Sequence, residues 1–568
     1  MAEAKKPAGL IYGLNETPPP TIIALNGVQH VGLIAINLVY PVLIFRAAGV
    51  PSDTIANFLG LGMLVLGIAT FLQVSRVGPV GSGFMCPATF TATYFVPSLL
   101  AAKVGGPPLV FGMTVFAGVL ETALAPLLNR LRAIFPPELS GLIIVMIGLS
   151  AAVSGLRSVL APGAEPVSVA EWWVAGITVA SMAILNIWGK GALRMLCALI
   201  GLGIGYAAAA SAGLIGANTA AVSNAAWIGF PHLSDLAWSF DFAIALPFAI
   251  ASVAAAMKAA GTITMCQRIN DANWVRTDMT SVTRGVLADG LSTTISGLAG
   301  GTGTNTSTPA VGLSQATGVT SRVVALAVGA ILVLLGIFPK LTALLAVMPR
   351  SVMLPALLFT ITFILVNGLQ VLTSRLFDVR RTLVIGFALI VGVSIEAFPG
   401  IAAAAPPSIA PIIGSSMVSA SVVALVLNLV FRIGVRKTAR LTLEHGEADH
   451  QKIQDFFEMQ TAVWGARPDV AKRATFGVLQ LIDVVVEEFW TGGPVTIEAS
   501  FDEFNLDVRV MYLGEPPPLP DRRPTNEEIM ESEQGARLLA GFMLRRNADR
   551  VRADMHNGMA RVHFHFDH

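Results

Sequence analysis

Residues 309–318 read PAVGLSQATG, a short segment of small and polar residues that stands between long apolar runs. It begins with a proline, contains two glycines and carries no charged side chain. In a lipid bilayer, backbone can leave the helix only where protein or a water-filled cavity surrounds it, because lipid cannot satisfy the freed N–H and C=O groups. Transporters hold their cargo at broken, polar-lined segments of this kind. The segment therefore predicts a substrate-binding break inside a membrane-spanning bundle.

The composition predicts an all-α polytopic membrane protein. Of 568 residues, 54% are hydrophobic and 13% are charged, against about 45–50% and about 25% in soluble proteins. Apolar runs of about twenty residues, long enough to cross a hydrocarbon core of about 30 Å, recur through most of the chain. Two segments are weak as full spans, since Pro87 interrupts one and another is too short. We expect fourteen segments, at 21–46, 54–75, 86–102, 108–128, 138–156, 171–188, 192–213, 241–264, 283–300, 308–318, 321–338, 350–370, 381–398 and 411–433.

Basic residues indicate how these segments are oriented. Lysine and arginine gather at alternate segment ends, which places both termini in the cytoplasm by the positive-inside rule. The first twenty residues lack the apolar core of a cleavable signal peptide. We therefore predict a multi-pass protein of the inner (cytoplasmic) membrane, surrounded by the lipid bilayer.

Nothing in the sequence points to catalysis. We find no nucleophile elbow, phosphate-binding loop or metal-ligand spacing. Cys86, Cys197 and Cys266 are not spaced for a disulfide framework or a metal site. The net charge of +1 gives no indication of a nucleic-acid partner. We predict that the protein is not an enzyme, uses no cofactor or metal and binds no nucleic acid.

The composition divides the chain into three parts. Residues 1–20 form a cytoplasmic segment, 21–433 the membrane domain and 434–568 a charged, cytoplasmic α/β domain. Periodicity within this last domain predicts the order helix, two strands, helix, two strands. The predicted elements are Lys472–Phe489, Val495–Phe501, Leu506–Tyr512, Gln534–Arg545, Arg550–Met555 and Met559–Phe566.

The order of elements in the C-terminal domain resembles the ATPase fold of histidine kinases and anti-sigma-factor serine kinases. Its nucleotide motifs are poor in this chain, because Tyr512-Leu513-Gly514 stands where that fold has Asp-x-Gly. No asparagine occurs where the fold's helix binds metal, at Val486, Glu487 or Glu488. The resemblance implies a degenerate fold used for docking or oligomer contacts, with a functional kinase as the alternative.

Three histidines close the chain, His563, His565 and His568. They suggest a metal site. However, Arg561 and the first two histidines alternate with apolar residues, which favours one solvated face of a strand.

The spacing of Pro309, Gly312, Thr317 and Gly318 resembles the signature of the nucleobase–ascorbate transporter family, the uracil/xanthine permease type of nucleobase–cation symporter. That signature reads (Q/E/P)-N-x-G-x-x-x-x-T-(G/K/R), and Ala310 replaces its asparagine. The resemblance covers most of the membrane domain and implies an inverted repeat of seven plus seven segments. Segments 1–4 and 8–11 would form a core domain, and segments 5–7 and 12–14 a gate domain through which family members often dimerise.

The resemblance also implies where substrate binds. The family has a Gln-His pair in its first segment, matched by Gln29-His30, and the structural alternative is a helix–helix hydrogen bond. Tyr94, in the broken third segment, is the candidate for stacking on a base, or it packs in the core. The expected contacts from the tenth segment are Thr308, Pro309, Ala310, Gly312 and Gln315.

The eighth segment departs from the family. Lys258 stands where the family has a base-binding glutamate, and Thr262 stands where it has an ionisable coupling group. A lysine near the bilayer centre costs roughly 2.5–3.5 kcal/mol and therefore needs a partner or a task. Four roles are open for Lys258. It could be a fixed cation that replaces the coupling ion or a ligand for an anionic substrate, or it could donate a proton or pair with a structural acid. Asp289, which matches the family's Asp-Gly pair, is the candidate counter-ion or remaining proton carrier.

The resemblance implies a transporter of nucleobases of the xanthine, urate and uracil class that works by alternating access. The departures at Lys258 and Thr262 predict atypical or absent proton coupling. Two alternatives stay open: a small-anion transporter or exchanger, and a membrane sensor that signals through the C-terminal domain.

Overall fold

The computed structural model divides the chain into two compact units, Met1–Leu429 and Val430–His568. It describes every residue except 1–4, 77, 129–135, 161–165, 216–218, 234–235, 275–276, 374–376, 399, 405, 407–412, 432–436, 445–448, 485–489, 503–504, 526–534, 557 and 568. The positions discussed above at 486–488 and 568 lie outside the described residues.

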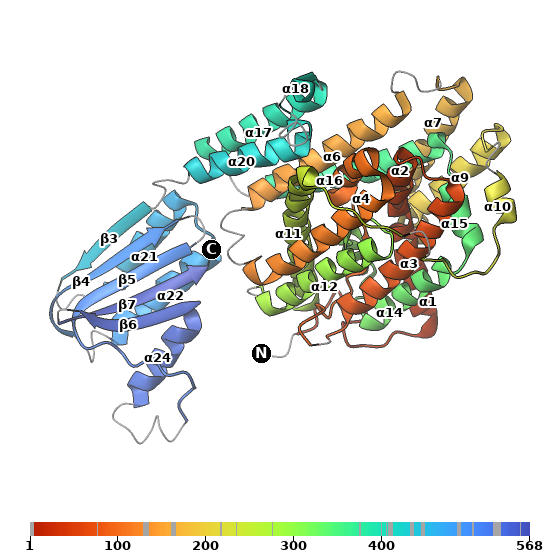
Figure 1. The fold of residues 1–568 in the computed structure, drawn as a ribbon. Coiled ribbons are helices and arrows are strands. Elements are labelled where there is room, and N and C mark those ends of the chain that lie inside the picture. The colour runs from red at the N-terminus through yellow and green to blue at the C-terminus, as the bar shows by residue number, and fades with distance from the viewer. Residues whose placement is uncertain are drawn as a thin grey trace. The chain divides into compact units, whose positions relative to one another are not determined.

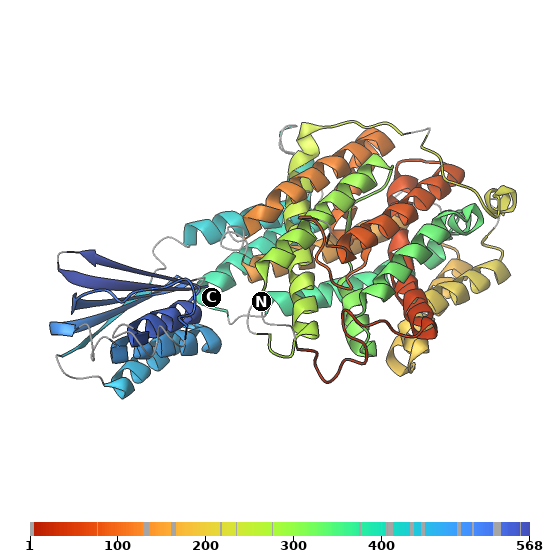
Figure 2. The same ribbon diagram turned by 90° about the horizontal axis from the view of Figure 1, so that it is seen from below.

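The first unit is a bundle of helices with two short strands (Figures 1 and 2). A helix overlaps each of the fourteen segments expected from the sequence. The elements are α1 (Pro20–Ala35), η1 (Ile36–Leu38), α2 (Val39–Ala47), α3 (Ser52–Val74), β1 (Ala88–Phe90), η2 (Ala92–Tyr94), α4 (Phe95–Leu124), η3 (Ala125–Leu127), α6 (Pro137–Leu160), α7 (Val169–Trp188), α8 (Ala192–Met195), α9 (Cys197–Ser211), α10 (Thr219–Asn224), η4 (Phe242–Ile244), α11 (Ala245–Asn270), α12 (Met279–Leu298), β2 (Thr304–Thr306), α13 (Thr308–Thr317), α14 (Arg322–Gly336), α15 (Pro339–Ala346), α16 (Arg350–Leu372), α17 (Val379–Ala397), α18 (Gly400–Ala403) and α20 (Ser416–Phe431).

Only some of these helices are simple membrane spans. Among the described residues, seven are long and apolar enough to cross a membrane, or eight if the bent pair α14 and α15 counts as one span. The third and fourth expected segments fall in α4, which leaves helical geometry at Gly106 (φ 67°) just before Pro107 and Pro108. The chain is thus a multi-pass membrane protein, and its fourteen crossings remain a prediction.

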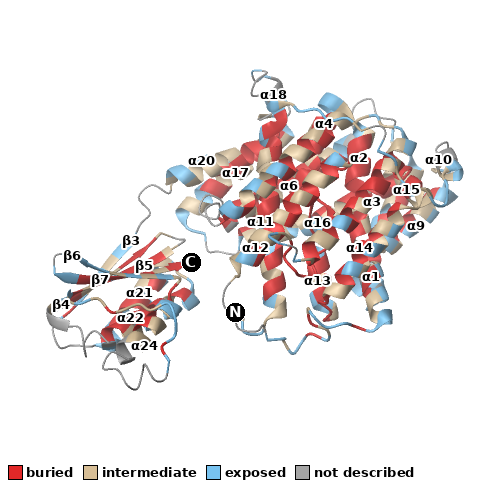
Figure 3. Cartoon of the chain, turned by 60° about the horizontal axis from the view of Figure 1, so that its bottom comes forward, coloured by how far each residue is buried: buried red, intermediate tan, exposed pale blue. Residues whose placement is uncertain are grey.

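Helix contacts fall into two groups within this unit. In the first group α4 packs on α12 and α11, α14 packs on α3 and α1, and α12 also contacts α3 and α11. In the second group α16 packs on α6, α7 and α9, while α17 packs on α6. Buried residues run through the centre of the bundle, whereas helices such as α17 carry exposed large apolar side chains, as expected for faces that meet lipid (Figure 3).

The helices α4 and α12 approach closely because glycines face one another at their crossing. A Cβ on Gly118 would lie 2.4 Å from the backbone nitrogen of Thr294, and a Cβ on Gly290 would lie 2.6 Å from that of Thr122. Small residues let helix backbones approach in membranes, where the solvent offers no hydrophobic drive for association. This crossing brings together side chains that lie far apart in the sequence.

The two broken segments meet as strands inside the helical bundle. β1 and β2 pair in antiparallel register, with Ala88 opposite Thr306 and Phe90 opposite Thr304. All six strand residues are buried. Pairing satisfies backbone groups that have left the helix, as burial at membrane depth requires.

The break in the tenth segment lies earlier than the sequence indicated. Residues 309–317 are helical, and the non-helical backbone precedes them in β2. Pro309 occupies the first turn of α13, where its missing N–H removes no intrahelical hydrogen bond. Gly318 then ends the helix in the left-handed region (φ 67°).

The second unit is a five-stranded antiparallel sheet with helices on one face (Figure 2). The strand order is β3-β4-β5-β7-β6. Alternate strand residues such as Val510 and Phe564 are buried together with Ile482 in one apolar cluster. The elements are β3 (Lys437–Leu443), α21 (His450–Trp464), α22 (Pro468–Val484), β4 (Trp490–Phe501), β5 (Asn505–Gly514), α24 (Gly535–Asn547), β6 (Arg550–His556) and β7 (Met559–Asp567). They follow the predicted order, with an additional strand and helix before it.

Candidate substrate site

One face of α11 contacts the first residues of both half-helices. The ammonium of Lys258 donates to Thr91 Oγ1 at 3.3 Å. One turn later, Thr262 Oγ1 lies 2.7 Å from Thr308 Oγ1. Residues four apart share a face of a helix, so α11 bridges the start of the third segment's helix and the start of α13. The structure thus brings together three of the predicted site residues, Lys258, Thr262 and Thr308, and their role toward substrate remains a prediction.

The half-helix ends at this site are capped by hydroxyl groups. Thr91 Oγ1 accepts from the Thr93 backbone N–H at 3.3 Å, and Ser307 Oγ accepts from the Ala310 N–H at 3.4 Å. Helix N-termini carry partial positive charge. With the ammonium of Lys258 beside them, this region attracts anions and carbonyl oxygens.

Two buried acids balance the lysine. The Glu121 side chain is 0% exposed and that of Asp289 is 2% exposed. Asn305 donates to Asp289 Oδ2 at 2.6 Å and to the Ala255 carbonyl at 3.0 Å, which ties β2 to α12 and α11. Lys258 interacts with the charges of both acids.

Our sequence interpretation missed Glu121. It expected no carboxylate at the family's site positions other than Asp289, because Glu121 lies on α4, outside every matched motif. A glutamate in the last turn of a long apolar helix was itself the signal, since ionisable residues in membrane segments usually have a function. Its proximity to Asp289 depends on the α4–α12 crossing and cannot be read from spacing.

The predicted Gln29-His30 pair is buried in α1. His30 Nδ1 lies 2.7 Å from the Asn26 carbonyl oxygen, and Nε2 lies 3.1 Å from Ser314 Oγ and 3.2 Å from the Ala310 carbonyl oxygen. A neutral ring with the proton on Nδ1 donates to Asn26 and accepts from Ser314. His30 therefore holds α13 against α1, and its role toward substrate remains a prediction.

The Tyr94 side chain is buried beside β2. Its hydroxyl donates to Glu121 Oε2 at 2.9 Å. A Cβ at Gly303 would come within 2.1 Å of the ring, so only glycine fits there. These contacts place Tyr94 next to the acids, and its stacking on a base stays a prediction.

The matched residues of α13 divide into two faces. Ala310 is buried and faces His30, whereas Pro309 and Gln315 are exposed. A Cβ on Gly312 would meet no atom within 4 Å. Thr317 Oγ1 donates to the Leu313 carbonyl at 3.0 Å near the helix end, and the Gly318 carbonyl accepts from the backbone of Ile11 and Tyr12. The Thr-Gly end of the motif thus anchors the N-terminal segment.

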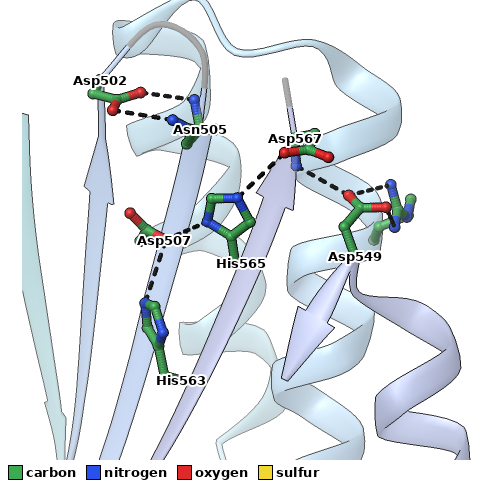
Figure 4. A network of polar contacts seen from close by, with 8 residues as sticks. Asp502, Asn505, Asp507, Asp549, His563, His565 and Asp567 are labelled. Carbon is green, nitrogen blue, oxygen red and sulfur yellow. Dashed lines mark hydrogen bonds and ion pairs between the residues drawn. The ribbon is translucent and has the colours of Figure 1, made fainter. Parts of the chain in front are cut away.

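The C-terminal histidines belong to a strand-face network (Figure 4). Asp507 Oδ1 lies 2.8 Å from His565 Nδ1 and 3.3 Å from His563 Nε2, and His565 Nε2 lies 3.2 Å from Asp567. Within the described residues, no group of three potential ligands is arranged to hold a metal ion. The two histidines lie on one face of β7 and pair with acids of that face.

This network predicts a pH dependence for the C-terminal unit. Hydrogen bonds that the His565 ring donates to Asp507 and Asp567 raise the pKa of His565 to about 9. Burial alone would raise the pKa of Asp507, but the two histidines outweigh it and hold that pKa below its usual range. A raised histidine pKa stabilises the fold fully below about 6.5, and this stabilisation is lost as pH rises through about 9. Asp507→Asn should therefore destabilise the unit by about 2 kcal/mol at pH 6 and much less at pH 10.

Pulse proteolysis of the full-length protein in urea at both pH values measures this difference. Asp554→Asn on β6 is the matched control, because Asp554 is an exposed acid on the same sheet. It should change stability by less than about 0.5 kcal/mol. Equal destabilisation by Asp507→Asn at both pH values would contradict the charged pairing.

Comparison with known proteins shows consistent matches over the membrane unit. Residues 22–401 match the permease family profile of xanthine and uracil permeases. A putative purine permease of Clostridium perfringens is 27% identical over 435 residues, covering 74% of this chain and 93% of that protein. The xanthine permease XanP of Escherichia coli is 26% identical over 442 residues, covering 74% and 94%. The uric acid permease PucJ of Bacillus subtilis is 27% identical over 445 residues, covering 75% and 97%.

Solved structures match at lower similarity. The transmembrane domain of the cyanobacterium bicarbonate transporter BicA matches with a TM-score of 0.45 and 15% identity, over 73% of this chain and 99% of that one. SLC26A9 matches with a TM-score of 0.47 and 12% identity, over 75% of this chain and 68% of that one.

Proposed function

The chain belongs to the xanthine/uracil permease family, and we propose on that basis that it carries a nucleobase of the xanthine, urate or uracil class across the cytoplasmic membrane. It is a transporter rather than an enzyme. One observation carries the choice of site: Lys258 and Thr262 on α11 contact Thr91 and Thr308 at the starts of the two half-helices.

The charges at this site favour bases with acidic, oxygen-rich edges. Lys258 and two helix N-termini offer positive charge, and hydroxyl groups of threonine offer hydrogen bonds in both directions. Xanthine and urate carry several carbonyl oxygens and lose a proton readily. We therefore expect them to bind more tightly than uracil.

The movement that we propose is that of a core domain against a gate domain. Lys258, Thr262, Glu121 and Asp289 come from α11, α4 and α12 of the first packing group, and α13, which carries Thr308, contacts α1 and α11 of that group. These elements belong to the segments predicted for the core. The second group, α6, α7, α9, α16 and α17, comes from segments predicted for the gate, through which we also propose a homodimer with both termini in the cytoplasm. Displacement of the first group along the second would expose the site alternately to the two faces of the membrane.

Uptake into proteoliposomes tests the function. Labelled xanthine, urate, uracil and bicarbonate are supplied with and without an imposed pH gradient. We expect saturable uptake of at least one base and none of bicarbonate. Bicarbonate uptake alone would favour the small-anion alternative suggested by Lys258. Base binding without any flux would favour a membrane sensor.

For the C-terminal unit we propose a docking role on a degenerate ATPase-type fold. The order of helices and strands supports the fold, while Tyr512, near the end of β5, stands where that fold has the aspartate that recognises adenine. Binding of a fluorescent ATP analogue to the full-length protein tests this proposal. Saturable, magnesium-dependent binding would contradict it.

A further inference from the structure

The carboxyl groups of Glu121 on α4 and Asp289 on α12 contact each other inside the first unit. Each is within hydrogen-bonding reach of the other. An ionised carboxylate has no proton to donate, so such a contact requires a proton on one of the two. Two ionised carboxylates so close together in a buried site would repel strongly.

The surroundings of the pair indicate which oxygen carries the proton. Asp289 accepts hydrogen bonds from the Asn305 side chain and the Thr306 backbone, as an ionised carboxylate does. Glu121 Oε2 accepts from Tyr94, whereas Glu121 Oε1 is buried and has no donor. The proton therefore belongs on Glu121 Oε1, from which it is donated to Asp289.

Few other titratable groups face this pair. They come from three elements packed around it: Lys258 on α11, Tyr94 on η2 and Cys86 just before β1. Of these, only Lys258 carries a positive charge. With one shared proton, the lysine and the pair sum to zero charge; without that proton, they sum to −1.

We propose that Glu121 holds a transferable proton, shared with Asp289, whose binding is coupled to the binding of an anionic substrate at Lys258. This inference rests on the proposed function and identifies a coupling group outside the matched motifs. When an anion engages Lys258, the lysine compensates the two acids less, so the pair binds its proton more tightly. Linkage then requires the proton to strengthen substrate binding by the same factor. The atypical coupling expected from Lys258 is thus a relocation of the proton site from α11 to α4.

Calorimetry of xanthine binding to the full-length protein tests the coupling. Titrations at one pH in two buffers of different ionisation enthalpy give the number of protons taken up per xanthine bound. At a pH high enough that the substrate-free pair has lost most of its shared proton, we expect wild-type protein to take up about half a proton or more beyond Glu121→Gln, because that variant cannot titrate at position 121. Comparing two proteins cancels the ionisation of xanthine itself. The ratio of the wild-type affinity for xanthine to that of Glu121→Gln should rise as the pH is lowered, by up to about tenfold per pH unit.

Control variants keep the test decisive. Glutamine preserves the shape of Glu121 and can accept from Tyr94, so folding should survive. Asp289→Asn is the second variant and should lose the same proton uptake. Glu138→Gln changes another buried acid, which lies 3.2 Å from Arg381 on α17, and should keep the wild-type proton count. Equal proton uptake in wild type and Glu121→Gln would overturn the proposal.

Infrared spectroscopy separates this proposal from the proposed function. A protonated, water-excluded carboxyl group has a C=O band that should be present in wild type and absent in Glu121→Gln. If no nucleobase binds, the proposed function fails, and the coupling to nucleobase binding fails with it. The infrared band still shows in that case whether Glu121 is protonated. If xanthine binds and wild type shows neither the band nor the extra proton, only the coupling proposal fails.

Discussion

Lys258→Ala is expected to weaken binding of xanthine and urate by at least 100-fold, or about 2.8 kcal/mol, while the protein remains folded and inserted. The lysine supplies the one full positive charge among the groups that bridge the half-helices. Removing one member of a buried charged set also leaves its partners uncompensated, here Glu121 and Asp289. The acids then gain protons instead, and the site loses its attraction for an anion.

Equilibrium binding of labelled xanthine to purified protein measures this effect. Lys258→Arg is the conservative variant, because it keeps the charge but not the size, and it should retain part of the affinity. Lys103→Ala removes an exposed lysine of α4 and serves as the control, with no change expected. Unchanged binding in Lys258→Ala would place the substrate elsewhere in the protein.

Gly290→Ala should have the second largest effect, on stability and on binding together. The added Cβ would lie 2.5 Å from Thr122 Oγ1, 2.6 Å from the Thr122 backbone nitrogen and 2.9 Å from the Gly118 carbonyl. Backbone cannot yield as a flexible side chain does, so α12 must move away from α4. We expect a loss of about 1–3 kcal/mol in stability. Because Gly290 follows Asp289 and Thr122 follows Glu121, the shift also separates the two acids.

Thermal unfolding in detergent and xanthine binding measure the two consequences. Gly176→Ala on α7 is the matched control, because a Cβ there would meet no atom within 4 Å. It should leave both measurements unchanged. Wild-type stability in Gly290→Ala would mean that α4 and α12 are not tightly packed at this crossing.

Several features of the fold were predictable because they depend on local patterns. Apolar runs predicted where helices lie, since long helices at membrane depth must satisfy their own backbone. Pro87 and the glycines and proline around residue 312 indicated two interruptions, and the structure has strands beside both. Alternation and helical periodicity likewise predicted the order of elements from α22 to β7.

The candidate site was predictable only where a residue was unusual for its surroundings. Lys258 could be singled out because a lysine in an apolar helix needs a partner. Glu121 met the same criterion, but no motif pointed to it. The position of the break before α13 was also predicted wrongly, because a proline in the first turn of a helix resembles a proline that interrupts one.

The sequence alone predicted the multi-pass character, the positions of the helices and the separate α/β unit. Each of these follows from hydrophobicity and periodicity along the chain. The sequence could not show that β1 pairs with β2, that α11 bridges two half-helices, or that Glu121 meets Asp289. Those contacts join residues 46 positions apart for Thr262 and Thr308 and 167 positions apart for Lys258 and Thr91. The meeting of Glu121 with Asp289 also depends on Gly118 and Gly290, which let α4 and α12 touch. Close packing of distant segments, rather than any local preference, places the opposing charges in one site.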